Sequence, residues 1–140
     1  VWREVKMEEP HLISNLTKRL VEEVKKNGLA AYNNPQDSLT QPQAATIKQV
    51  VFSEMYPDTV NRILMLEQWD YDEQEAQMIV KIIALAPAYT YAGKYYPLFW
   101  NKYSAVTPLL KEIECTTDKR VKTIHDVFEQ RLFYSFIIKY

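Results

Sequence analysis

Residues 62–89 constrain the fold of this chain more than any other stretch, because two apolar runs flank a short polar segment there. Apolar side chains that alternate on either side of a polar turn are the signature of an antiparallel β-hairpin. The second run, MIVKIIALA, is apolar at almost every position, which indicates a strand that is covered on both faces or central in its sheet. We expect Pro87 to end this strand. The side chains spaced by two are Ile63, Met65 and Trp69 in the first run and Met78, Val80, Ile82 and Ala84 in the second.

Helical patterns occur on both sides of this hairpin. After an extended start at residues 1–5, Leu16 and Leu20 belong to an apolar series with helical spacing over residues 11–27, and Gly28 stands where a C-terminal cap is expected. Residues 29–34 read as a short strand or connector, and residues 34–43 as a polar loop. Shorter helices are predicted over residues 44–56 and 104–113.

The last segment, TIHDVFEQRLFYSFIIKY at residues 123–140, is predicted to be one helix lying on the sheet. Thr123 and Asp126 have the spacing of a capping box, and Ile124, Phe128 and Phe136 belong to one helical face. The fold class that follows is α+β: an antiparallel β-sheet with helices packed on it and a helical C-terminus.

Composition fits one globular domain and argues against partners that are recognised by charge. The chain has 140 residues, of which 47% are hydrophobic and 25% charged, the usual values for a soluble globular protein. Its net charge of −1 lacks the basic surplus of proteins that neutralise many phosphates, so we expect no nucleic-acid partner. No apolar run approaches the roughly 20 residues that cross a bilayer, so we expect no transmembrane segment.

Residues with reactive side chains are few and scattered. The two glycines, Gly28 and Gly93, cannot make a glycine-rich phosphate loop. Cys115 with His11 or His125 would be the candidate nucleophile and base, but nothing in their spacing brings them together. The same three residues have no recognisable zinc-ligand spacing.

The acidic cluster of the hairpin centre is the remaining candidate for chemistry. Asp70, Asp72, Glu73 and Glu75 lack the glycine and the spaced glutamate of a calcium-binding loop, and a solvated hairpin turn explains them. An unrecognised hydrolase that uses Asp70 and Glu75, or Cys115, is the enzymatic alternative. Our expectation is that the chain has no catalytic residue, no metal site and no cofactor.

An aromatic-rich stretch, YYPLFWNKY at residues 95–103, offers the candidate binding surface. We expect Phe99 and Trp100 to fill the core beneath a helix, because large apolar rings are usually buried. Tyrosines suit half-wet sites, and protein interfaces are enriched in Tyr and Trp. The candidate partner interface is therefore Tyr95, Tyr96, Trp100 and Tyr103. The alternative is a glycan- or peptidoglycan-binding groove lined by the same four rings.

Three stretches together resemble a known family. They are WDYD at residues 69–72 with the strand that follows, YPLFWNKY at residues 96–103, and the segment that contains DVFEQRLF at residues 126–133. They are similar to the W-x-(F/Y)-D turn, the Y-P-(L/M)-F-W segment and the closing D-x-F-x-x-(R/K) helix of the GldN/PorN family. Members of this family are ring-forming periplasmic components of the type IX secretion system of Bacteroidetes, which also serves gliding motility.

The resemblance implies a non-enzymatic structural subunit of the secretion and gliding machinery. The implied partners are a GldK/PorK-type lipoprotein beneath the outer membrane and other secretion-system subunits, with self-association into a homo-oligomer as a further option. No catalytic residue or cofactor is carried over from the family. Residues 1–140 are similar to its single core domain, and we expect a fragment without N- and C-terminal extensions.

Overall fold

The described residues form one antiparallel sheet with helices on one face. The computed structural model describes residues 1–7, 9–32, 58–116 and 119–139. The strands are β1 (Trp2–Lys6), β2 (Arg62–Asp72), β3 (Gln77–Tyr91), β4 (Lys94–Pro97), β5 (Asn101–Lys102) and β6 (Tyr134–Lys139). The helices are α1 (Pro10–Asn27), α3 (Tyr103–Leu110) and α4 (Ile124–Glu129).

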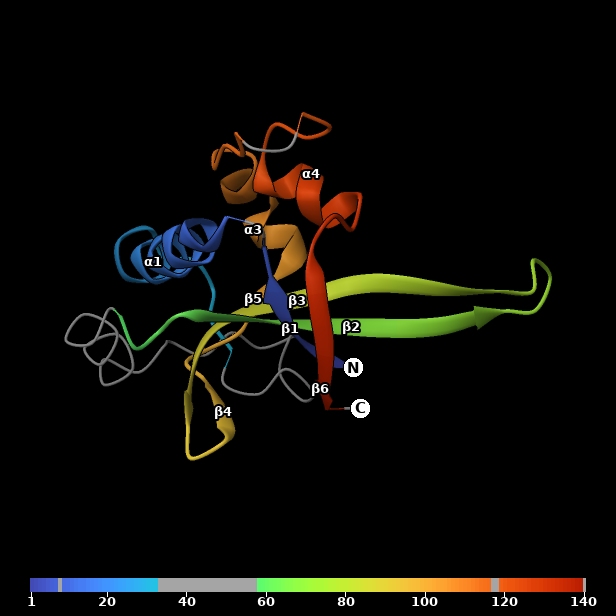
Figure 1. Ribbon diagram of the computed structural model, residues 1–140, viewed down its shortest axis with the longest axis horizontal. Helices are drawn as coiled ribbons and strands as arrows, with labels where there is room; N and C mark the ends of the chain where they lie inside the picture. The colour runs from blue at the N-terminus through green and yellow to red at the C-terminus, as the bar shows by residue number, and fades with distance from the viewer. Residues whose placement is uncertain (8, 33–57, 117–118, 140) are drawn as a thin grey trace.

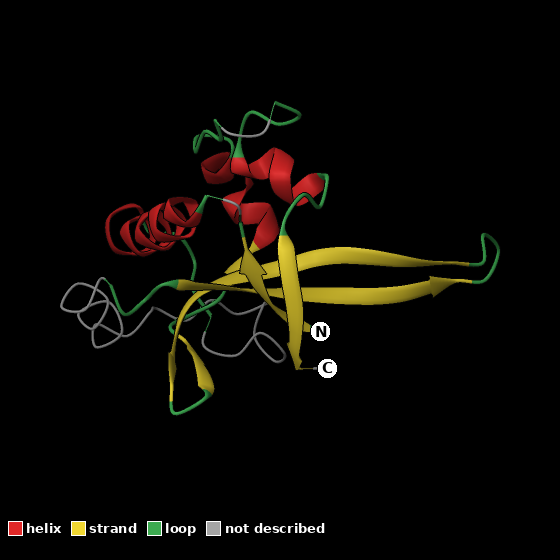
Figure 2. Ribbon diagram, viewed as in Figure 1, coloured by secondary structure: helices red, strands yellow, loops and turns green. Residues whose placement is uncertain are grey.

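The sheet order is β4-β3-β2-β1-β6, with β5 paired to β3 off this path. All of these pairings are antiparallel. The three helices gather above the sheet in Figure 1, and Figure 2 separates helices from strands by colour. The α+β class, the antiparallel sheet and the helices packed on it are therefore confirmed.

Helix α1 forms where the apolar spacing predicted it. Leu16 and Leu20 are fully buried, while the lysines of the last turn, Lys25 and Lys26, suit the helix dipole. Gly28 ends the helix with φ +70°, and its N–H donates to the carbonyl of Glu23. Because a left-handed residue at this position favours glycine, Gly28 acts as the C-terminal cap that the sequence indicated.

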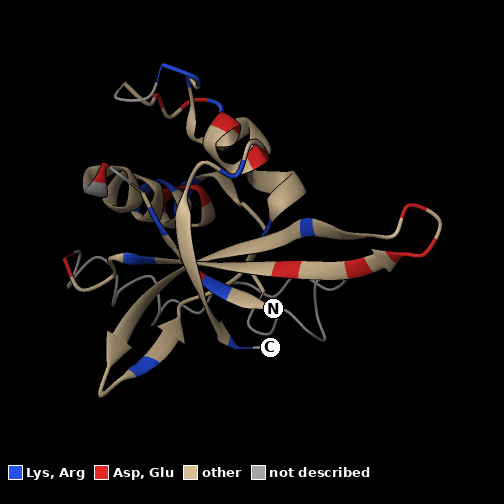
Figure 3. Ribbon diagram, turned by 45° about the vertical axis from the view of Figure 1, so that its right-hand side comes forward, with Lys and Arg blue, Asp and Glu red and all other residues tan. Residues whose placement is uncertain are grey.

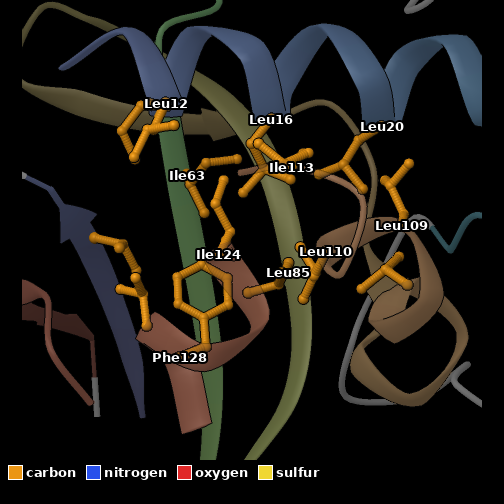
Figure 4. Close-up of a cluster of buried hydrophobic side chains, with 14 of the residues drawn as sticks. Leu12, Leu16, Leu20, Ile63, Leu85, Leu109, Leu110, Ile113, Ile124 and Phe128 are labelled. Carbon is orange, nitrogen blue, oxygen red and sulfur yellow. The ribbon is translucent and has the colours of Figure 1, made fainter. Parts of the chain in front are cut away.

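The main hydrophobic core fills the space between the helices and the sheet. In Figure 4, Leu12, Leu16 and Leu20 of α1 point down toward the strands, where Ile63 of β2 and Leu85 of β3 lie. Burying one such leucine side chain is worth about 1.5–3 kcal/mol. The short helices and the segment that follows α3 complete this core with Leu109, Leu110, Ile113, Ile124 and Phe128.

The predicted hairpin is confirmed as β2 and β3, with an irregularity where it leaves the core. Leu66 pairs with Ala84 but Glu67 pairs with Ile82, so Ile83 is an extra residue on β3. This bulge separates Ile82, which packs with the helix-side core, from Ala84, which belongs to a cluster on Trp100 and Leu64. The expected spacing of two between Ile82 and Ala84 therefore does not keep them on one face.

Two expectations about β3 are corrected by the structure. Pro87 does not end the strand, which continues to Tyr91. A proline has no backbone N–H, so it removes one hydrogen-bond donor from the strand pairing but keeps its acceptor. The carbonyl of Pro87 accepts from the N–H of Leu98 at 2.9 Å. The strand is also not covered along its whole length, because Met78 and Ile79 are exposed where β2 and β3 project beyond the rest of the sheet (Figure 1).

The expected helical C-terminus is wrong beyond Glu129. Thr123 and Asp126 do make the predicted capping box, with both hydrogen bonds present. The chain then turns at Arg131, whose φ is +53°, and continues as strand β6. Aromatic and β-branched residues of β6 favour a strand, and β1 offers it an antiparallel partner. As a result Phe136 is exposed instead of lying on a buried helix face.

The loop and short helix expected over residues 34–43 and 44–56 lie outside the described residues. Before that gap, Tyr32 makes an isolated bridge to Trp100 with backbone hydrogen bonds of 2.9 and 2.8 Å. The side-chain amide of Asn101 in β5 also donates to the carbonyl of Ala30 at 2.9 Å, so the described part of the predicted connector is attached to the sheet.

Candidate functional site

A tight hairpin positions the first half of the aromatic stretch. Strand β3 ends at Tyr91 and β4 begins at Lys94, so only Ala92 and Gly93 form the loop. Both have positive φ, +51° and +75°, as a two-residue hairpin turn that matches the twist of its strands requires. The turn places Tyr95 opposite Thr90 and Tyr96 opposite Tyr89, on opposite faces of the hairpin.

Tyr95 turns its hydroxyl inward. It donates to Oε1 of Glu4 at 2.5 Å, and the buried Glu4 also forms an ion pair with Lys6 at 3.0 Å. Burial, followed by the hydrogen bond to the Glu4 carboxylate, raises the pKa of Tyr95 to about 12. Because its polar tip is held inside the domain, Tyr95 ties β4 to β1.

Tyr96 is the member of the candidate set whose ring is open to solvent. Its exposed fraction is 37%, and its ring stacks on Tyr89 with centroids 5.2 Å apart and planes 16° from parallel. Tyr91, in the same hairpin, is 72% exposed. These three tyrosines therefore make an aromatic surface at the β4 edge of the sheet.

Trp100 and Tyr103 are held in the interior and at its border. Trp100 is 0% exposed and meets Trp2 edge-on with centroids 5.0 Å apart, and the adjacent Phe99 is also buried, as predicted for the core. Tyr103 is half-buried, and its hydroxyl donates to Oε1 of Glu129 at 2.7 Å. Burial, and then this hydrogen bond, raises the pKa of Tyr103. The four candidate residues thus do not share one exposed surface.

The residues considered for chemistry differ in burial and in their partners. Cys115 is buried, His11 is exposed, and Nε2 of His125 lies 3.6 Å from Oε1 of Glu129. The acidic cluster forms the hairpin tip, where Oδ1 of Asp72 accepts the N–H groups of Gln74 and Glu75 at 3.0 and 3.3 Å. Among the residues that the structure describes, no group of three or more His, Cys, Asp or Glu could hold a metal ion.

A buried ionic cluster at the start of the projecting hairpin was not anticipated from the sequence. The fully buried side chain of Glu67 pairs with Arg3 of β1 and with Arg131 of the turn before β6. The indole N–H of Trp69 also donates to Glu67, at 3.3 Å. The sequence does contain one indication that Glu67 is buried. It continues the spacing of two set by Ile63 and Met65, so it falls on the inward face of β2.

The electrostatics of Glu67 follow from these partners. Burial opposes ionisation of the carboxyl, but the hydrogen bonds from Arg3, Arg131 and Trp69 outweigh it and hold the pKa of Glu67 below its usual value. The ionised carboxylate therefore joins β1, β2 and the segment between α4 and β6. It fixes the point from which the hairpin projects.

A comparison with known protein families shows to which family the chain belongs. The model of the family described as "Gliding motility associated protein GldN" matches residues 1–140. The chain belongs to the GldN family. No curated protein matches it. This family is described by its association with gliding motility and not by a catalytic activity.

The stretches that carried the resemblance occupy different parts of this GldN-family domain. WDYD lies on the outer part of β2, YPLFWNKY runs from β4 through β5 into α3, and DVFEQRLF covers the end of α4 and the turn after it. Across the described ranges, no helix is long and apolar enough to cross a membrane.

Proposed function

We propose that this GldN-family protein is a non-enzymatic structural subunit of the type IX secretion and gliding machinery. It assembles in the periplasm with a GldK/PorK-type lipoprotein into a ring attached to the outer membrane through that partner. The observation that carries the proposal is the family match across residues 1–140.

The aromatic surface of the β3–β4 hairpin is the proposed contact with the lipoprotein. Tyr96 and Tyr91 are large and exposed, and such rings are typical anchors of protein interfaces. Tyr95 contributes by holding the hairpin to β1 through Glu4, whereas Tyr103 joins α3 to Glu129 of α4. Trp100 is buried in the cluster on which Tyr95 packs.

The proposal is tested by mixing the chain with the lipoprotein and measuring mass by size-exclusion chromatography with light scattering. Tyr96→Ala is expected to weaken the complex by about tenfold or more, while circular dichroism stays unchanged because the ring is largely outside the core. Tyr134→Ala is the matched control. Tyr134 is 63% exposed on β6, at the opposite edge of the sheet from β4.

Two negative results would contradict different parts of the proposal, the contact surface or the function itself. A complex that forms equally well with Tyr96→Ala and Tyr134→Ala would place the contact elsewhere on the domain. Failure of the unaltered chain to bind the lipoprotein under any condition would contradict the proposed function itself.

The glycan-binding alternative has less support from the geometry. It needs Tyr95, Tyr96, Trp100 and Tyr103 along one open groove, whereas Trp100 is buried and two of the tyrosine hydroxyls are engaged by carboxylates. Only the Tyr89–Tyr96 stack resembles a platform for a sugar ring. Binding of peptidoglycan fragments that is lost in Tyr96→Ala would favour this alternative.

A further inference from the structure

The outer part of the β2–β3 hairpin, residues 67–83, forms a two-stranded arm. Strand β1 pairs with β2 as far as Leu66, Val1 extends this pairing to Glu67, and β4 and β5 pair with β3 only from Ala84 onward. Among the described residues, the β3 edge of the arm therefore lacks a neighbouring strand, and the arm projects away from the rest of the sheet in Figure 1. An isolated pair of strands is marginally stable in water, so the arm would gain from a further strand.

The two edges of the arm differ in a way that matters for strand pairing. The β2 edge carries Asp70 and Asp72, and charged side chains discourage the addition of a strand. The β3 edge, QMIVKII at residues 77–83, carries one charge, Lys81, and Met78 and Ile79, on opposite faces, are 54% and 37% exposed. This sequence has the pattern of a central strand but lies at an edge, which points to a neighbour that none of the described residues supplies.

We propose that this neighbour is the same β3 segment of a second copy of the chain, paired antiparallel. The direction follows from charge, because Asp72, Glu73 and Glu75 gather at the tip of the arm (Figure 3). Parallel arms would bring two acidic tips together, and like charges directly opposite are destabilising. Antiparallel arms keep the tips at opposite ends and bring Lys81 of each copy toward the acidic turn of the other.

The pattern of side chains also selects the register. Centring the pair on Ile79 places Ile79 opposite its own copy, Met78 opposite Val80, and Lys81 opposite Gln77. The apolar residues at the centre, Met78, Ile79 and Val80, then meet only apolar residues, and no charge faces a like charge. The contact is two-fold symmetric, the commonest arrangement of homo-oligomers, and it extends the two arms into one four-stranded sheet. It uses a different surface from the tyrosines of the proposed lipoprotein contact.

The first experiment measures self-association of the chain by sedimentation equilibrium. Ile79→Lys is expected to weaken the dimer by about tenfold or more, because it sets two lysines against each other at the symmetry axis. Tyr71→Lys is the matched control. Tyr71 is 61% exposed on the same arm but on β2, so its variant is expected to dimerise like the unaltered chain.

The second experiment tests the register by oxidation. Antiparallel partners have Cα atoms about 4.5–5.5 Å apart, within the range that a disulfide spans. Ile79→Cys is therefore expected to give a disulfide-linked dimer, whereas Tyr71→Cys is not. Cys115 is buried and does not compete.

A chain that stays monomeric at the highest attainable concentration would overturn this proposal. So would a dimer that is equally stable with Ile79→Lys, or one in which Ile79→Cys and Tyr71→Cys cross-link alike. Binding of Ile79→Lys to the lipoprotein is measured in parallel and is expected to be unchanged. The self-pairing of β3 and the proposed secretion function can thus fail separately.

Discussion

Replacing Glu67 by glutamine tests how the domain holds its projecting hairpin. The change keeps the size of the side chain but removes the charge that Arg3 and Arg131 share. The side chain of Glu67 is 0% exposed, so the two guanidinium groups would face a neutral amide in a site with little water. The cost is therefore expected to appear in the free energy of unfolding.

The size of the stability loss depends on how far water can solvate the two arginine side chains once the carboxylate charge is gone. Removing one partner of a fully buried ion pair costs about 3–5 kcal/mol, because the other charge is left buried. Here the side chains of Arg3 and Arg131 are 18% and 39% exposed, so water can solvate them in part. We expect a loss of about 2–3 kcal/mol, which for a domain of this size lowers the melting temperature by about 6–12 °C.

Thermal and urea unfolding of Glu67→Gln at several pH values provides the assay. The pKa of Glu67 is held below its ordinary value of 4.5, so its stabilising contribution is present above the unfolded pKa and lost as pH falls through the folded one. The stability difference between the two proteins is therefore expected to be largest near neutral pH and to shrink below about pH 4.

The control is Glu112→Gln, which breaks the exposed ion pair with Arg19. Exposed pairs contribute about 0–1 kcal/mol, so this variant is expected to melt close to the unaltered protein. A melting temperature for Glu67→Gln as high as that of the control would refute the reasoning. So would a stability difference that stays constant between neutral and acidic pH.

Two further substitutions probe local hydrogen bonds. Tyr95→Phe removes the bond to the buried Glu4 and is expected to cost about 1–2 kcal/mol. The pKa of Tyr95 is raised from 10.0 to about 12, so the stability that this hydrogen bond contributes is present below pH 10 and is lost as pH rises through about 12. Unfolding of both proteins at alkaline pH measures this loss. Thr123→Ala removes the N-cap that accepts from Asp126 and is expected to cost about 1 kcal/mol. Hydrogen exchange is expected to be faster in the first turn of α4, with the exchange rate of α1 as the internal reference. An unchanged rate in α4 would contradict the prediction.

Local patterns in the sequence predicted several of the elements that the structure describes. The spacing of apolar residues found α1 and the β2–β3 hairpin, and Gly28 and the Thr123 capping box placed two helix ends. These features depend on neighbours within a few residues, so a pattern is enough to indicate them. The candidate interface was only partly predictable, because alternation does not tell which of Tyr95 and Tyr96 turns inward.

Long-range pairing decided the rest. Residues 134–139 join β1 as a strand although they follow a helix, because the turn at Arg131 and the Glu67 cluster bring them to the free edge of β1. Trp100 is buried against Trp2, whereas Met78 is exposed on the arm. This difference in burial likewise depends on where the neighbouring strands end. The sequence by itself determined the elements whose cause is local and the family to which the chain belongs. Only the tertiary structure decided which apolar residues are covered, because burial depends on contacts between segments that are distant in the chain.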